Sequence, residues 1–304
     1  MNTTTNQVQI VEVGPRDGLQ NESVMLTTSQ KVDMITRLAD AGLRRIEVAS
    51  FAHPDKVPQM ADAEAVLAAL PPRDDVSYIG LILNWHGWRR ATDTAVNEIN
   101  MNVSASNTFN QRNQGSDTDD TINVLGQIVL DAADQGIPVT ATIATTWGCP
   151  FEGEMPMERL LFVAGAAAAA GVAEIALADT IGVADPWSVT ERITAVRRVV
   201  QGIPLRAHFH NTRNTGMANA YAAINAGVTT LDSSVGGIGG CPFAPAATGN
   251  IPTDDLVYML GRAGIPTGVS LQEVIAITGT MESLLGKPLD AMLPRAGEFP
   301  QSAS

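Results

Sequence analysis

The chain has 304 residues, of which 45% are hydrophobic and 17% charged, so it can bury a large core and is not a disordered protein. A formal net charge of −13 argues against a nucleic-acid-binding protein, whose binding surface would be basic. Two cysteines exclude a disulfide scaffold, and the longest apolar stretch, residues 160–173, is too short to cross a bilayer, so we expect a cytoplasmic protein without membrane partners.

Eight short β-prone segments alternate with helical ones along the chain. The β-prone segments begin near Val8, Arg45, Val76, Glu98, Val139, Ala173, Leu205 and Thr229. Helical segments fill the intervals, for example 29–41, 59–70, 119–135, 156–170, 186–200 and 215–226. An Ala-Gly pair recurs where such a segment ends and a β-prone run follows, at residues 41–42, 170–171 and 226–227, which is typical of a helix ended by a left-handed glycine.

This alternation predicts a parallel sheet of the α/β class. Eight strand-helix units in a chain of this length predict one (β/α)8 TIM barrel over about residues 8–265, with a helical extension over about 266–295. The single barrel domain would therefore span the whole of 1–304. A doubly wound open sheet is the alternative, but it usually has fewer strands in this length.

Active sites in such barrels lie where the strands end, so polar residues at those ends are the candidates. His208 and His210 stand two apart in the seventh predicted strand, so both imidazoles would point to one face, well spaced to bind one metal ion. Asp17 after the first strand and Asn250 after the eighth are candidate oxygen ligands. Such a mixed set favours Mg²⁺ or Mn²⁺, and Zn²⁺ stays possible. The alternative is that the two histidines only satisfy each other or buried amides.

Three further residues near strand ends could carry chemistry. Arg16 adjoins Asp17 and could hydrogen-bond a developing oxyanion, or it could form only a surface ion pair. Glu47 lies among apolar residues of the second strand and needs a partner, which Arg16 could be. Cys241 follows a glycine-rich loop that could act as a lid, where a thiol can transfer a proton, or it could be a small apolar residue.

The three lysines exclude one kind of carbon–carbon chemistry. A Schiff-base aldolase needs a lysine inside the barrel, but the candidates fall on the first helix, in a loop and in the tail: Lys31, Lys56 and Lys287. A barrel of this sequence that breaks carbon–carbon bonds should use a metal ion.

Several motifs together resemble the 3-hydroxy-3-methylglutaryl-CoA lyase family of metal-dependent barrel lyases. Residues 11–22 read Val-Glu-Val-Gly-Pro-Arg-Asp-Gly-Leu-Gln-Asn-Glu, like that family's opening signature, and residues 236–242 read Gly-Gly-Ile-Gly-Gly-Cys-Pro, like its cysteine loop. Residues 57–60, 148–153, 179–182 and 255–260 also match, and the similarity runs from about residue 8 to 290.

The resemblance implies a reaction and a role for each matching residue. A divalent cation would be held by Asp17, His208, His210 and Asn250. Cleavage of the acyl-CoA substrate would give acetyl-CoA and acetoacetate, as in leucine degradation. Arg16 would stabilise the enolate with Glu47 behind it, and Cys241 would transfer a proton. Asp179 would be a further catalytic group, and Gln20 and Gly240 would contact the substrate. Similar enzymes are commonly homodimers, which we expect here.

Several positions depart from the residues usual in that family. Asp55 and His86 stand where lysines are usual, and Asn211 stands where an aspartate is usual. The fifth predicted strand has threonines where an arginine and a tyrosine or cysteine are common: Thr140, Thr142, Thr145 and Thr146. These changes leave open how CoA is held. The alternatives are a lyase of the same mechanism for another 3-hydroxy acyl-CoA of the citramalyl type, a lyase for a hydroxy acid without CoA, and a metal-binding barrel without activity.

Overall fold

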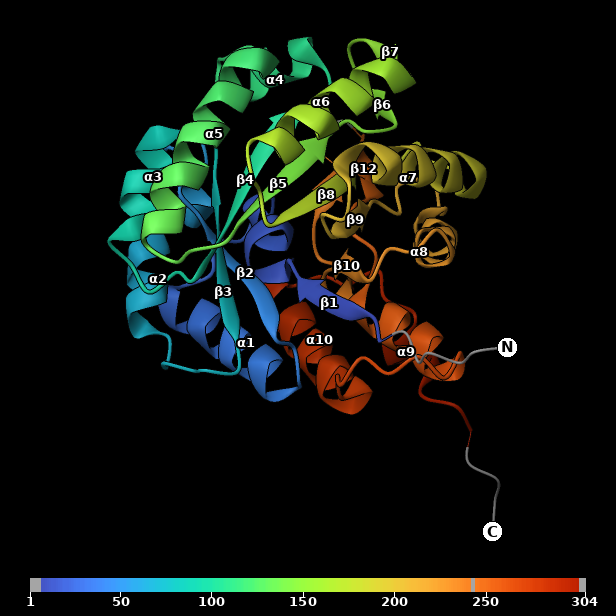
Figure 1. Ribbon diagram of the computed structural model, residues 1–304. Coiled ribbons are helices and arrows are strands. Elements are labelled where there is room, and N and C mark those ends of the chain that lie inside the picture. Colours follow the sequence, from blue (N-terminus) through green and yellow to red (C-terminus); the bar gives the residue numbers. More distant parts are fainter. Residues whose placement is uncertain (1–6, 242–243, 301–304) are drawn as a thin grey trace.

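Eight parallel strands form a closed barrel at the centre of the computed structural model, which describes residues 7–241 and 244–300 (Figure 1). Their order around the barrel is β1-β10-β9-β8-β5-β4-β3-β2. The strands are β1 (Gln9–Glu12), β2 (Arg45–Ser50), β3 (Ser77–Ile82), β4 (Glu98–Ser104), β5 (Val139–Ala144), β8 (Glu174–Asp179), β9 (Leu205–Phe209) and β10 (Thr230–Ser233). The predicted TIM barrel is confirmed, and every strand begins within one residue of the predicted position.

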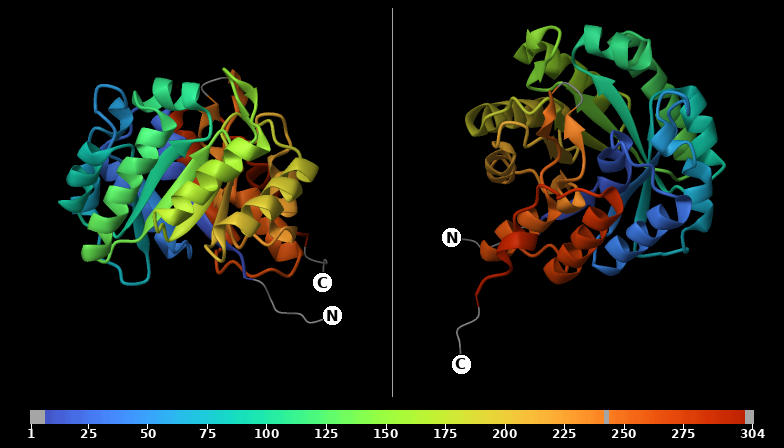
Figure 2. Two further views of the ribbon diagram at one scale, coloured as in Figure 1. Left: turned by 45° about the horizontal axis from the view of Figure 1, so that its top comes forward. Right: turned by 180° about the vertical axis from the view of Figure 1, so that it is seen from behind.

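Helices surround the barrel, as the further views in Figure 2 show. Those that follow strands are α1 (Thr28–Asp40), α2 (Ala63–Ala69), α3 (Trp85–Thr92), α4 (Asn107–Gln114), α5 (Thr118–Asp134), α6 (Met157–Ala169), α7 (Pro186–Val200), α8 (Gly216–Asn225) and α9 (Thr253–Arg262). The predicted segment 59–70 is divided into a 3₁₀ turn at Pro58–Met60 and α2. In the part of the chain that the structure describes, no helix combines the length and apolar character needed to span a bilayer.

Two hairpins and the C-terminal helices complete the fold. The hairpins are β6 (Gly148–Cys149) with β7 (Gly153–Glu154) and β11 (Gly240–Cys241) with β12 (Ala244–Thr248). The C-terminal helices are α10 (Leu271–Leu285) and α11 (Leu293–Ala296), and α10 packs against α1.

Gly42 shows why a glycine ends α1. Its φ of +104° lies in the region that side-chain-bearing residues avoid. A Cβ at this position would also lie 2.2 Å from the carbonyl oxygen of Gly268. Beside it, the Ser270 N–H donates to the Ala41 carbonyl at 2.8 Å. The end of α1 is thus joined to the segment that leads into α10.

Charged side chains fill the N-terminal end of the barrel interior, where aliphatic residues are more usual. The Arg45 guanidinium binds both Glu98 and Glu174, the latter at 2.7 and 3.0 Å. The Thr140 hydroxyl donates to Glu174 at 3.3 Å. All four residues sit at or near the first position of their strands, so this end of the barrel is closed by ion pairs.

We expect Arg45→Ala to destabilise the protein by about 3 kcal/mol, because the substitution removes the cation that binds Glu98 and leaves Glu174 only the more distant Arg206, at 3.9 Å. Urea unfolding followed by circular dichroism measures the change. Arg73→Ala is the matched control, since Arg73 also contacts two carboxylates, those of Asp40 and Asp75, but at the surface, where the expected loss is under about 1 kcal/mol. Equal losses from the two variants would contradict the assignment.

Candidate active site

The chain leaves β1 in a tight π-helical turn at Gly14–Gly18 that carries Arg16 and Asp17. The Asp17 and Gly18 N–H groups both donate to the Val13 carbonyl, at 2.7 and 3.1 Å. Such turns often occur at functional sites, because they add a residue that redirects neighbouring side chains.

The buried side chain of Glu12 holds this turn in place. Its buried carboxylate accepts the Gly14 N–H at 2.7 Å, the Val235 N–H at 2.9 Å and the Thr253 hydroxyl at 2.7 Å. Burial raises the pKa of Glu12 to about 7, although these three donors oppose the shift. A single carboxyl group thus joins the loop after β1, the loop after β10 and the start of α9.

Arg16 lies between two carboxylates at the C-terminal end of the barrel. Its Nε donates to Glu47 Oε1, and a terminal nitrogen donates to Asp17 Oδ1 at 2.6 Å. The same nitrogen lies 3.5 Å from Gln20 Oε1. Glu47 is fully buried on β2, so its charge is compensated by this arginine.

Asp17, His208 and His210 can together offer three metal ligand atoms, all within 4.8 Å of one another. His208 Nδ1 lies 3.1 Å from Asp232 Oδ2, which leaves its Nε2 for a metal ion. Asn250 joins the group, because its Nδ2 donates to Asp17 Oδ2 at 2.9 Å.

Two polar atoms in this group support a fit to a cation. Asn250 Oδ1 and His210 Nδ1 are buried and have no hydrogen-bond partner among the described residues. The Asn250 amide group is oriented by its donations to Asp17 and to the Ile238 carbonyl, so the free atom is an oxygen acceptor. Carboxylate, imidazole and amide oxygen form a donor set suited to a divalent cation.

Burial and the neighbouring charges shift the pKa values of Asp17, His208 and His210 in different directions. Burial alone would raise the pKa of Asp17, but Arg16 and the two histidines hold it well below its usual range. Burial would lower the pKa of His208, but the hydrogen bond and charge of Asp232 raise it above its ordinary value. Burial and the neighbouring His208 lower the pKa of His210 to about 4.

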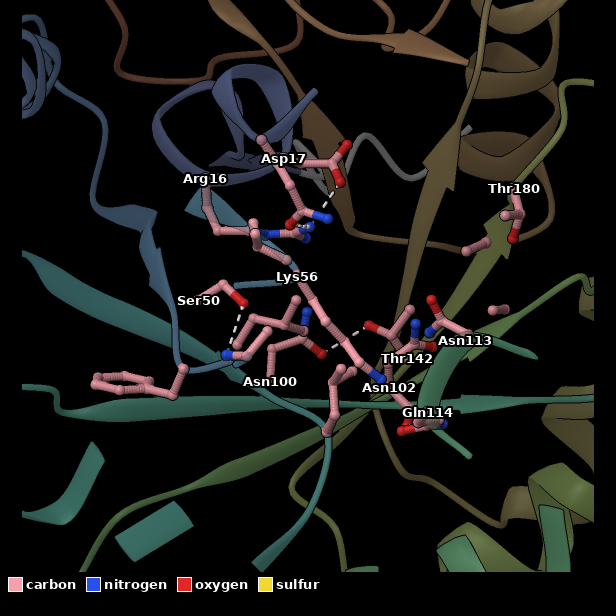
Figure 3. A pocket seen from close by; sticks show the side chains of 18 of the residues that line it. Arg16, Asp17, Ser50, Lys56, Asn100, Asn102, Asn113, Gln114, Thr142 and Thr180 are labelled. Atoms are coloured by element: carbon pink, nitrogen blue, oxygen red, sulfur yellow. Dashed lines mark hydrogen bonds and ion pairs between the residues drawn. The ribbon is translucent and has the colours of Figure 1, made fainter. Parts of the chain in front are cut away.

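A cavity of about 530 Å³ opens at this end of the barrel. Arg16, Asp17, His208 and His210 line one side, together with Gln20 and Gly240. The rest of the lining mixes polar side chains, which Figure 3 labels, with apolar ones: Ser50, Lys56, Asn100, Asn102, Asn113, Gln114, Thr142 and Thr180, and Phe51, Leu81, Leu83, Phe109 and Ala144. The reactive group therefore shares one cavity with a mixed polar and apolar lining.

The structure places two of the expected site residues away from the cavity. Asp179 is buried, and its oxygens accept the Val183 and Ala184 N–H groups at 2.9 and 3.0 Å, while its neighbours Ala178 and Thr180 line the cavity. This geometry does not support the catalytic role expected for Asp179, because the strand turns its side chain outward to hold the following loop. Glu47 is the second of these residues: it does not line the cavity, and it contacts Arg16 through Oε1.

Cys241 takes part in β11 through its backbone, which pairs with Ala244. Its side chain lies outside the described residues, so its expected proton-transfer role stays a prediction.

The residues that depart from the family pattern fall in different places. His86 lines the cavity at its exposed rim, and Asp55 is exposed beside His53. Asn211 accepts the Gly216 N–H at 3.0 Å at the start of α8. Thr140 lies at the opposite end of the barrel, beside Glu174.

Sequence reasoning missed Asp232 and Arg206. Asp232 contacts His208 of the ligand group, and Arg206 in turn holds Asp232. Arg206 is fully buried and donates to both Asp232 oxygens, one of them at 2.9 Å. It also lies 3.6 Å from Glu47 Oε2. The period of two along β9 puts Arg206 on the same face as His208, a signal that could have identified it.

The comparisons with known proteins all point to one family of proteins. The HMGL-like family model matches residues 7–281. The chain is 38% identical to the hydroxymethylglutaryl-CoA lyase YngG of Bacillus subtilis, over 93% of this chain and 95% of that protein. It is 37% identical to the (R)-citramalyl-CoA lyase of Chloroflexus aurantiacus, over 98% and 97%.

A solved structure of an HMG-CoA lyase from Acinetobacter baumannii, in complex with coenzyme A and 3-methylmalate, is similar along its whole length. The TM-score is 0.94 at 36% identity, covering 100% of this chain and 99% of that one.

We expect His208→Ala to weaken Mn²⁺ binding by more than about 100-fold, because it removes a ligand rather than a supporting group. Isothermal titration calorimetry measures the affinity. His86→Ala is the matched control, since His86 lines the same cavity but lies outside the ligand group. Unchanged affinity in His208→Ala would refute the ligand assignment.

We also expect Mn²⁺ affinity to fall as the pH decreases through the raised pKa of His208, by about tenfold per pH unit below it. The metal must displace the proton that His208 binds there, whereas His210, with a pKa of about 4, is already neutral. Calorimetry at several pH values tests this. Asp232→Asn removes the carboxylate that raises the His208 pKa, so the Mn²⁺ affinity of this variant should begin to fall at a lower pH than that of the wild type. An affinity independent of pH between about 5.5 and 8 would contradict the prediction.

Proposed function

Because the chain belongs to the HMGL-like family, we propose that it is a divalent-metal-dependent carbon–carbon lyase that cleaves 3-hydroxy-3-methylglutaryl-CoA to acetyl-CoA and acetoacetate. The observation that carries the proposal is the joint placement of Arg16 and the Asp17–His208–His210 group on one wall of the cavity. The reaction needs an oxyanion donor and a cation site beside each other, and this wall offers both.

The metal site would be formed by Asp17, His208, His210 and Asn250. A bound cation supplies Lewis acidity toward the hydroxyl and carboxylate oxygens of the substrate. The donor set favours Mg²⁺ or Mn²⁺, with Zn²⁺ as the alternative. Asp232 orients His208 through its Nδ1, so the imidazole keeps one direction as substrate enters.

Cleavage reverses a Claisen-type addition. The C3 hydroxyl loses its proton to a base and becomes a ketone, the C2–C3 bond breaks, and its electron pair moves into the thioester to form an enolate. A proton added at C2 then gives acetyl-CoA. Arg16 is placed to donate to the thioester oxygen, where negative charge appears only as the bond breaks. Glu47 holds its Nε, and the Cys241 thiol is the proposed proton donor at C2.

Citramalyl-CoA is the second candidate substrate. One of the relatives is a (R)-citramalyl-CoA lyase that covers nearly the whole chain. Its substrate lacks one methylene of the acid arm but keeps the C3 hydroxyl, the C3 methyl and the thioester, so the same residues would serve. The cytoplasmic location and the homodimer expected from the sequence stay predictions.

We expect acetyl-CoA when the protein is incubated with Mg²⁺ or Mn²⁺ and 3-hydroxy-3-methylglutaryl-CoA, and none after treatment with EDTA. Liquid chromatography of the CoA esters measures the product. A panel adds citramalyl-CoA and the free hydroxy acids. Cleavage of the free acids alone would favour a lyase without CoA, and no cleavage by metal-loaded protein would leave a barrel that only binds metal.

Arg16→Gln should lower kcat by about 10²–10³ and change KM little, because the lost donor acts mainly on charge that develops in the transition state. Steady-state kinetics measures both constants, and circular dichroism checks that the variant folds despite the partner lost by Glu47. Arg112→Gln, at an exposed position of α4 that does not line the cavity, is the control. A rise in KM at constant kcat would show that Arg16 only binds the ground state.

A further inference from the structure

Thr145, at the end of β5, has a backbone conformation that its side chain disfavours. Its φ is +57°, in the left-handed region, where a β-branched residue is an outlier. Most other described residues with a positive φ are glycines, and the two that are not, Gln201 and Asn214, are exposed and unbranched at Cβ. Thr145 is fully buried. Strained residues of this kind persist only where their surroundings hold them, and they cluster at functional sites.

The hydroxyl group of Thr145 holds this conformation in place. It donates to the Ala144 carbonyl at 2.7 Å. The same oxygen lies 2.8 Å from Ser104 Oγ and accepts the Ser106 N–H at 3.2 Å. Because the Thr145 proton is directed to the carbonyl, Ser104 is the donor in the pair of hydroxyl groups. A glycine would adopt this φ without strain but would lose all three contacts.

The strained turn directs the backbone N–H of Thr145 to a residue of the cavity. This N–H donates to Thr180 Oγ1 at 2.8 Å. Thr180 directly follows β8 and lines the cavity, where Figure 3 labels it. The next N–H, that of Thr146, donates to the Ala178 carbonyl at 3.1 Å, so the end of β5 is bonded to the end of β8. The hydrogen bond to Oγ1 favours one rotamer of the Thr180 side chain.

This hydrogen bond also determines what Thr180 can offer to a ligand. Within the part of the chain that the structure describes, Thr180 donates no hydrogen bond, so its proton remains available while its oxygen accepts the Thr145 N–H. The carboxylate and thioester oxygens of the proposed substrate only accept hydrogen bonds. A threonine that is already fixed in one rotamer can donate to such an oxygen without losing rotamer freedom on binding.

We propose that Thr145 is a positioning residue of the lyase, whose strained backbone holds the Thr180 side chain in the orientation that meets the substrate. This inference rests on the proposed function and involves no metal ligand. Thr145 itself is fully buried and is not among the residues that line the cavity, so it acts only through Thr180.

Two substitutions that remove the same hydroxyl group separate the role of the backbone from that of the side chain. Thr145→Ala keeps a Cβ that disfavours a positive φ, so the turn relaxes and the N–H moves away from Thr180. Thr145→Gly keeps this φ accessible without strain. We expect kcat/KM to fall by about tenfold in Thr145→Ala and by about threefold in Thr145→Gly, the scale of one hydrogen bond. Thr145→Ser, which keeps the hydroxyl group, should stay near the wild type.

The test is a double-variant cycle with Thr180→Val, which has the same shape but no hydroxyl group. Release of acetyl-CoA is followed with the thioester that the wild type cleaves fastest. Each kcat is divided by the concentration of sites that bind Mn²⁺, so that unfolded protein does not count. If Thr145 acts through Thr180, Thr145→Ala should leave kcat/KM unchanged in the Thr180→Val background. An equal loss in both backgrounds would indicate a general structural role and would overturn the inference.

Gln201→Gly is the matched control. Gln201 also has a positive φ, of +44°, but it is exposed at the C-terminal end of α7. Relief of strain there moves no residue of the cavity, so kcat/KM should equal the wild-type value.

Two further results would refute the role of Thr145 and leave the lyase function standing. One is a loss in Thr145→Gly as large as that in Thr145→Ala, and the other is an unchanged kcat/KM in Thr180→Val. If the metal-loaded wild type cleaves no 3-hydroxy acyl-CoA thioester, the lyase function fails and the inference fails with it.

Discussion

The need to compensate buried charge determines how this barrel is built. Arg16 can lie inside the cavity wall because Asp17 and Glu47 contact it, and Glu47 can be fully buried because Arg16 and Asn100 bind its two oxygens. Arg206 extends the same chain of contacts to Asp232, and Asp232 orients His208. The proposed oxyanion donor, Arg16, and the proposed metal ligand His208 are thus parts of one interior network, and a change to one member alters the positions of the others.

Much of this arrangement could be predicted from the sequence, because local patterns encode it. Helix-ending glycines marked the strand-helix units, and the period of two put His208 and His210 on one face. The direction of the Asp179 side chain could not be predicted, since its motif does not say toward which face of the strand the residue points. Arg206 and Asn100 were missed for another reason. Their roles depend on partners on other strands, Asp232 and Glu47, and register across a barrel cannot be read from a single chain.

The residues that line the cavity come from different strands of the barrel. The reactive side comes from the ends of β1, β9 and β10, whereas Asn100, Asn102 and Thr142 come from β4 and β5. Substitutions of Asn102 or Thr142 can therefore change the lining of the cavity without replacing a proposed metal ligand.

The ion pairs that close the N-terminal end of the barrel also affect how stability varies with temperature. Exposure of apolar surface on unfolding raises the heat capacity, whereas exposure of polar surface lowers it. On unfolding, a barrel whose N-terminal end holds Arg45, Glu98 and Glu174 exposes less aliphatic surface there than one filled with valine and isoleucine. Its heat-capacity change is smaller, so its free energy of unfolding follows a flatter curve between cold and warm conditions.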